Sequence, residues 1–110
     1  MLEEKMTSLR KELIEYATHV ERMIDKSITG LMRKDSSLLV EVTDEDESKA
    51  NEWEMAIDEL CTTLIAQYEP KAKDLRTILM VMKMNNDLER AGDHAVNIAE
   101  SSLYLVERPS

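Results

Sequence analysis

Interruptions of the apolar pattern are rare in this 110-residue chain, and they constrain its fold more than any other feature. Only two places break the pattern: the polar run 33–37 and the proline turn at 68–70. In the three segments that these breaks separate, apolar residues recur at three- and four-residue intervals, as they do on the buried face of a helix. With just two glycines and two prolines, little else would end a helix. We therefore expect helices over about residues 2–31, 37–67 and 71–106.

Three helices of about 30 residues with short connections favour an all-α, up-down-up antiparallel three-helix bundle, which we expect to span residues 1–110 as one domain. Asp35 or Ser36 is the expected N-cap of the second helix. His19 lies beside the apolar stripe of the first helix, so we expect a solvated or edge histidine rather than a ligand. The expected stripe of the first helix is Leu9, Leu13, Ala17, Val20, Ile24, Ile28 and Leu31. That of the second is Leu39, Asp46, Ala50, Trp53, Ile57, Leu60 and Leu64, so that Asp46 faces inward.

Charge and composition exclude several classes of protein. Lys and Arg total 14 against 23 Asp and Glu, a net charge of −9. This balance argues against nucleic-acid binding, which depends on basic side chains, and is compatible with binding cations or a basic protein surface. The single Cys61 excludes an internal disulfide and suits a reducing compartment. No apolar run reaches about 18 residues and the start lacks a signal-peptide pattern, so we expect a cytoplasmic protein without membrane insertion.

Acidic residues interrupt the apolar lines of the third helix. Residues seven apart lie on the same face of a helix, and two such rows run along the third helix. One row includes Glu89 and the adjacent row includes Asp93, at positions where a helix would normally bury leucine. An unpaired carboxylate buried in an apolar seam costs several kcal/mol or more, which makes us expect a partner for them. Because the second and third helices turn near residue 68, position 47 should lie opposite position 90. Glu47 and Asn51 repeat the four-residue spacing of Glu89 and Asp93 on the facing helix. Because they lie to the side of that helix's stripe, we expect the two pairs to meet at the edge of the bundle, with Glu89 and Asp93 as one wall of a groove.

Oxygen ligands on two rigid helices are typical of sites for hard cations or oxophilic metals. Pairing of Glu89 with an arginine or lysine of another helix is an alternative from the same spacing, and catalysis by the carboxylates is a third. A di-iron bundle expects histidine three residues after its glutamate. Neither Glu47 nor Glu89 has one.

Three segments resemble one repeat of the PhoU family, bacterial regulators of phosphate uptake. They are Asn51 to Cys61, Pro70 to Arg76, and Asp87 to Asp93, which contains a Leu-Glu-Arg-x-Gly-Asp core. The order and intervals fit, and the resemblance covers about residues 9–106. It implies an all-helical protein in which two three-helix repeats form a six-helix assembly. Since only one repeat is present, the chain is either a fragment or a protein whose homodimer rebuilds that assembly.

The resemblance also implies a metal site, because some members carry iron or zinc clusters. Their motif, an acidic residue followed four later by Asp or Asn, maps onto Glu47 with Asn51 and onto Glu89 with Asp93. Magnesium or manganese is compatible with the same oxygen ligands. The supporting residues that we expect around this site are Asp46, Asn86, Asp87 and Arg90.

A PhoU-like protein is expected to be a regulator without catalytic residues. The resemblance implies that it restrains the phosphate-specific ABC transporter and the sensor kinase of the phosphate two-component system. One alternative is a magnesium-dependent all-α nucleotide pyrophosphohydrolase, which also clusters carboxylates on bundle helices. Such enzymes favour Glu-x-x-Glu and Glu-x-x-Asp pairs, whereas the pairs here are spaced by four. Another alternative is a metal-free helical adaptor.

Overall fold

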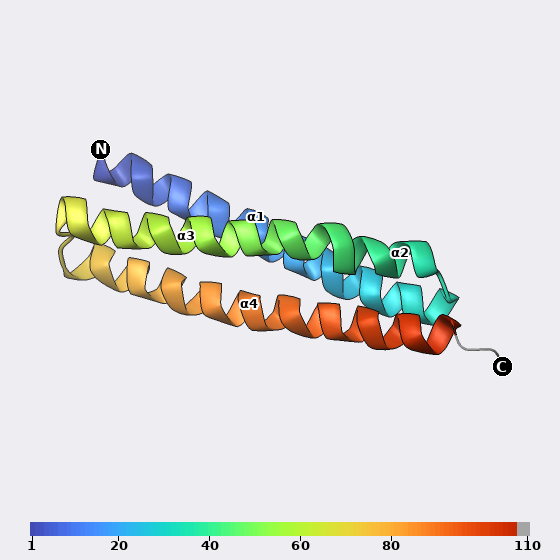
Figure 1. The fold of residues 1–110 in the computed structure, drawn as a ribbon. Coiled ribbons are helices and arrows are strands. Elements are labelled where there is room, and N and C mark those ends of the chain that lie inside the picture. Colours follow the sequence, from blue (N-terminus) through green and yellow to red (C-terminus); the bar gives the residue numbers. More distant parts are fainter. Residues whose placement is uncertain (108–110) are drawn as a thin grey trace.

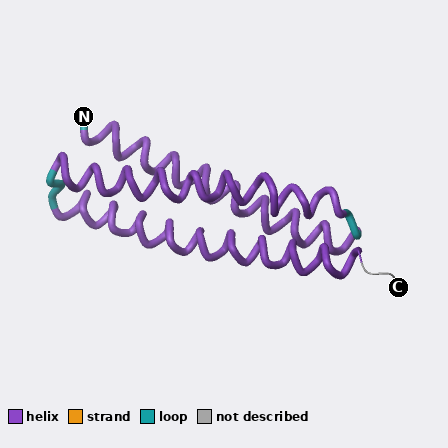
Figure 2. The backbone as a smooth tube through the Cα atoms, viewed as in Figure 1, coloured by secondary structure: helices purple, strands orange, loops and turns teal. Residues whose placement is uncertain are grey.

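The computed structural model describes residues 1–107, and these residues form a rod of helices measuring 60 × 17 × 16 Å without any strand (Figure 1). Helix α1 spans Leu2–Arg33, α2 spans Ser36–Val40, α3 spans Glu47–Tyr68 and α4 spans Ala72–Glu107. A π-helical turn, η1, covers Glu41–Asp46 and joins α2 to α3 in one continuous rod. The all-α, up-down-up bundle is thus confirmed, and Figure 2 shows its loops at opposite ends of the rod. The expected helix bounds agree with the observed bounds within two residues.

Backbone caps end the helices where the apolar pattern breaks. Lys34 adopts a left-handed conformation with φ 54°, and the following Asp35 amide donates to the carbonyl of Gly30 at 2.9 Å. The Asp35 carboxylate then accepts a hydrogen bond from the Leu38 amide at 3.1 Å, so Asp35 is the N-cap of α2. Glu69 is also left-handed, with φ 43°, and it ends α3 with its own amide donating to the carbonyl of Ile65 at 3.2 Å. These short caps set the antiparallel course of the three rods.

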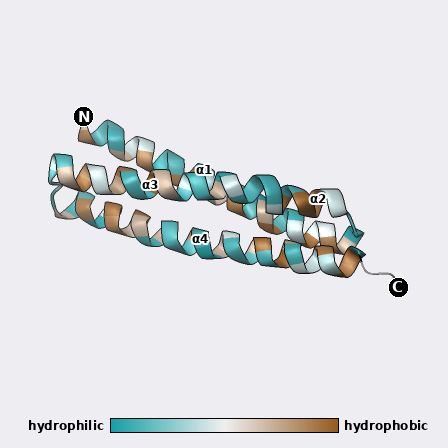
Figure 3. Cartoon of the chain, viewed as in Figure 1, coloured by the Kyte–Doolittle hydropathy of each residue, from teal (hydrophilic) through white to brown (hydrophobic). Residues whose placement is uncertain are grey.

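The buried face of α1 departs from the expected stripe in its second half. Ile28 and Leu31 are 50% and 38% exposed, whereas Ser27 and Gly30 are buried. Ser27 donates its hydroxyl to carbonyls of α1 and α4, each at 2.8 Å, so its polarity is satisfied. Gly30 packs directly on the side chain of Leu39 in α2. Small residues therefore form the contact face here, and the larger apolar side chains turn outward; Figure 3 shows polar and apolar positions alternating along each rod.

The inward face of α4 also differs from the one expected. Glu89 and Asp93 are exposed, so they do not replace leucine in a buried seam and instead lie at the rim of the bundle, as the register of the two acidic pairs indicates. The face is rotated toward small residues, and Gly92 is buried in it, with Val20 of α1 3.9 Å from where a Cβ would lie. The buried residues of α4 are Ile78, Val81, Asn85, Gly92, Ala95, Val96, Ala99 and Ser102.

Asp46 is 5% exposed, which confirms that it faces inward, but its surroundings were not foreseen. His19 is 7% exposed, and its Nε2 lies 2.9 Å from the Asp46 carbonyl oxygen. His19 is therefore buried, and the expectation that water surrounds it was wrong. Its ring also packs on that of Trp53, with centroids 5.0 Å apart. The acidic run 44–47 is therefore anchored to α1 through Asp46.

Candidate functional site

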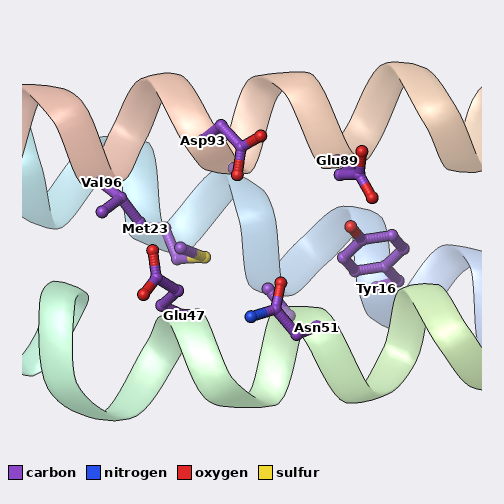
Figure 4. A pocket seen from close by; sticks show the side chains of 9 residues that line it. Tyr16, Met23, Glu47, Asn51, Glu89, Asp93 and Val96 are labelled. Carbon is purple, nitrogen blue, oxygen red and sulfur yellow. The ribbon is translucent and has the colours of Figure 1, made fainter.

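A small cavity lies between α3 and α4, with α1 behind it, and it gathers the residues that spacing singled out (Figure 4). Its volume is about 10 Å³, roughly the space that one water-sized sphere occupies. All four predicted metal ligands line it. The lining residues are Tyr16, Met23, Glu47, Ala50, Asn51, Glu89, Gly92, Asp93 and Val96.

The antiparallel course of α3 and α4 explains why these four side chains meet. Glu47 and Asn51 lie one turn apart on α3, and Glu89 and Asp93 lie one turn apart on α4. Figure 4 shows Asp93 and Asn51 near the middle of the cavity, with Glu47 toward Met23 and Glu89 at the opposite end. Glu47 is half-buried and the other three are exposed. The site is therefore a groove at the surface of the bundle.

As placed, the carboxylates line the cavity without converging to coordination distance. Within residues 1–107, no group of three or more His, Cys, Asp or Glu side chains lies close enough to hold a metal ion. Neighbouring carboxylates repel one another, and a bound cation removes that repulsion. The oxygen donors and the volume of the cavity fit one small cation. Glu47 and Glu89 lie toward opposite ends of the cavity, so their side chains would have to rotate inward to bind it.

Glu54 is an acidic member of this site that the sequence reasoning missed. It is half-buried on α3, and its pKa is raised by burial, then by the charge of Glu89 and by a hydrogen bond with that carboxyl group. Asn85 of α4 donates its Nδ2 to the main-chain carbonyl of Glu54 at 2.9 Å. The signal for Glu54 was its position three residues after Asn51, which places both on one helix face.

Tyr16 brings α1 into the site. It is buried, and its ring stacks against that of Trp53 with centroids 6.4 Å apart. Burial first, and then the charges of Glu54, Glu89 and Asp93, raise the pKa of Tyr16 to about 12. The phenol therefore stays protonated at neutral pH and is a hydrogen-bond donor at the cavity wall.

The expected supporting residues do not line the cavity. The side chain of Asp46 pairs with Lys26 of α1 at 3.0 Å. Arg90 and Asp87 face each other at 3.9 Å on the surface of α4, with 74% and 57% of their side chains exposed. Asn86 is exposed as well. Of these residues, only Asp46 is buried. Its side chain does not line the cavity, but it directly precedes Glu47, which does.

The model of the PhoU domain matches residues 13–102 of this chain. The chain belongs to the PhoU family. It is 36% identical over 103 residues to the phosphate-specific transport system accessory protein PhoU homolog of Pseudomonas putida, covering 94% of this chain and 40% of that protein. The homolog of Aquifex aeolicus is 36% identical over 105 residues, covering 96% and 47%. The Escherichia coli K12 protein, named phosphate-specific transport system accessory protein PhoU, is 34% identical over 99 residues, covering 90% and 41%.

The three relatives are longer than this chain, and their names describe an accessory role. The present chain spans less than half the length of each of the three. All three are named as accessory proteins of a transport system, and none as an enzyme. In the part of the chain that the structure describes, no helix is long and apolar enough to cross a bilayer.

Proposed function

We propose that this PhoU chain is a non-enzymatic regulator of phosphate uptake that acts through protein contacts. The family match over residues 13–102 carries this proposal, together with the accessory role printed in the names of the relatives. The contacts that we propose are with the phosphate-specific ABC transporter and with the sensor kinase of phosphate two-component signalling. The cavity of about 10 Å³ has no room for a nucleoside triphosphate, which argues against nucleotide hydrolysis at this site.

We propose further that Glu47, Asn51, Glu89 and Asp93 bind a divalent cation. Their donors are oxygen atoms only, the set that suits magnesium or manganese and also accepts iron or zinc. The cavity, at about 10 Å³, is about the size of one water-sized sphere, so we propose a single ion. When bound, the ion would neutralise the facing carboxylates and tie α3 to α4.

The alternative of ion pairing finds less support in the structure. Across residues 1–107, the ion pairs within 4.0 Å join Lys26 to Glu41 and Asp46, and Arg90 to Asp87. Glu89 and Asp93 take part in none of them. Two adjacent carboxylates that no basic side chain neutralises are available to a cation.

A second copy of the chain is the partner that we propose for the outer face of α1 and α4. There Ile14 and Met84 are 65% and 48% exposed, and Leu31 and Leu105 are 38% and 59% exposed. They line two apolar grooves, of about 270 and 470 Å³. At about 100° per residue, Met84 of the first groove lies on the side of α4 opposite Asp93, and Leu105 of the second lies about 120° round the helix from it. More than half of each relative lies outside its match to this chain, room enough for a second unit of this kind. Two-fold pairing of this face would give a homodimer, which light scattering would detect and Ile14→Glu/Met84→Glu would disrupt.

Complementation tests the regulatory role directly. In a bacterium that lacks its own PhoU, a reporter of phosphate-responsive genes would stay active in phosphate-rich medium. Expression of this chain should silence the reporter, and the variant Glu89→Ala/Asp93→Ala should silence it less. An exposed Arg22→Ala change is the matched control and should behave as the wild type. A reporter that stays fully active while the wild-type chain accumulates would refute the proposed role.

A further inference from the structure

The π-turn η1 is held at both of its ends by one lysine. Lys26 of α1 places its Nζ 3.3 Å from Oε1 of Glu41, the first residue of the turn, and 3.0 Å from Oδ2 of Asp46, the last. Residues five apart lie about 140° apart around an α-helix, too far round for one ammonium group to join them readily. In a π-turn, whose hydrogen bonds span five residues, they lie on the same side. The double contact therefore favours the π geometry over an α-turn.

Asp46 is tied to α1 through its main chain as well. Its carbonyl oxygen lies 2.9 Å from Nε2 of His19, and because a carbonyl only accepts, Nε2 carries the hydrogen. The side chain of Asp46 is 8% exposed and that of Lys26 is 28% exposed, so water competes weakly for the pair. Removing one partner would leave an uncompensated charge in the bundle. Asp46 is thus fixed against α1 in both side chain and backbone.

The residue that follows Asp46 is the first ligand of the proposed cation site. One extra residue in a turn rotates everything beyond it by about 100° relative to an unbroken α-helix. With Asp46 fixed against α1, Glu47 and Asn51 fall on the side of α3 that faces α4. We propose that Lys26 is a positioning residue that stabilises the π-turn and thereby directs Glu47 and Asn51 toward Asp93. Its effect on cation binding rests on the proposed function, whereas its effect on geometry does not.

Manganese titration of the full chain tests the first consequence. Lys26→Met should weaken Mn²⁺ binding at least tenfold, as loss of an outer-shell partner does at other metal sites. Lys26→Arg, which keeps the charge, should recover most of the affinity, and Arg22→Met on the same helix should change it less than twofold. Lys26→Met alone leaves the buried Asp46 carboxylate unpaired and could unfold the chain. The double variant Lys26→Met/Asp46→Leu replaces the ion pair with two apolar side chains and should stay folded. Wild-type affinity in that double variant would overturn the proposal.

Cross-linking without metal tests the geometry. In the variant Glu47→Cys/Asp93→Cys, dibromobimane should bridge the two thiols across the cavity. Cys61 can remain, because burial raises its pKa to about 11 and keeps it unreactive. Adding Lys26→Met/Asp46→Leu should slow bridging at least tenfold, and equal rates would overturn the positioning role. The two proposals can fail separately. If the wild-type chain binds no Mn²⁺ but Lys26→Met/Asp46→Leu still slows the bridging, the cation site is refuted and the positioning role of Lys26 is supported.

Discussion

The two glycines should respond in opposite directions to the same substitution. Both lie inside long helices, where alanine is favoured over glycine by about 1 kcal/mol. At Gly92 a new Cβ would meet only Val20, at 3.9 Å, which is ordinary contact. Gly92→Ala should therefore raise the free energy of unfolding by about 1 kcal/mol, and the midpoint temperature by about 4 °C.

At Gly30 the same Cβ would lie 2.5 Å from Cδ2 and 2.6 Å from Cγ of Leu39. Leu39 is fully buried, so relief requires repacking at a cost of about 1–3 kcal/mol. After the helix-propensity gain, Gly30→Ala should lower the free energy of unfolding by about 1 kcal/mol.

Urea denaturation followed by circular dichroism measures both changes. A Leu39→Ala background supplies the control, because the clash is gone there and Gly30→Ala should become stabilising. If Gly30→Ala stabilises the wild-type chain as much as Gly92→Ala does, the packing of α1 on α2 described above is wrong.

Three further changes probe single contacts. Asn85 is buried with an Oδ1 that lacks a partner among the described residues, so Asn85→Leu should raise the free energy of unfolding by about 1 kcal/mol in urea titrations. Asp35→Ala removes the N-cap of α2 and should lower it by about 1 kcal/mol in the same assay; no change would mean that the cap is dispensable. Because the pKa of Glu54 is raised in the fold, by burial first and then by Glu89, its contribution to stability is present below its ordinary pKa of 4.5 and is lost as pH rises through the raised value. Metal-free chain should thus gain stability as pH falls from 7 toward 4.5, and Glu89→Gln should flatten that slope.

The course of the chain was predictable because its breaks are few. The polar run before Asp35 and the turn at Pro70 divide the periodic pattern, and the caps observed there match that division. The rotation of each helix was not predictable from large apolar residues alone. At Gly30 the absence of a side chain lets Leu39 approach, and in α4 small residues such as Gly92 and Ala95 occupy the buried face. Periodicity cannot distinguish such a face from an exposed one.

The antiparallel alignment of α3 and α4 predicted some of the residues of the site but not all of them. Counting back from the turn placed Glu47 opposite the segment around Glu89, and both line the same cavity. Tyr16 was missed because its approach depends on the rotation of α1. The π-turn was missed because Asp46 falls seven residues after Leu39, so the expected stripe crosses the turn without an apparent break. The backbone shows the turn, and Lys26 contacts both of its ends. Hydrogen bonds that span 27 residues, such as that of His19 to Asp46, leave no trace in local sequence.

Elemental analysis of the purified chain beside Glu89→Ala/Asp93→Ala is the most direct test of the proposed cation site. Both samples would be dialysed against the same trace of magnesium, manganese, iron and zinc before measurement. We predict about one divalent ion per wild-type chain, since the cavity admits one small sphere, and a large loss in the variant. Equal metal content in the two samples, or none above background in either, would contradict the assignment of this groove as a cation site.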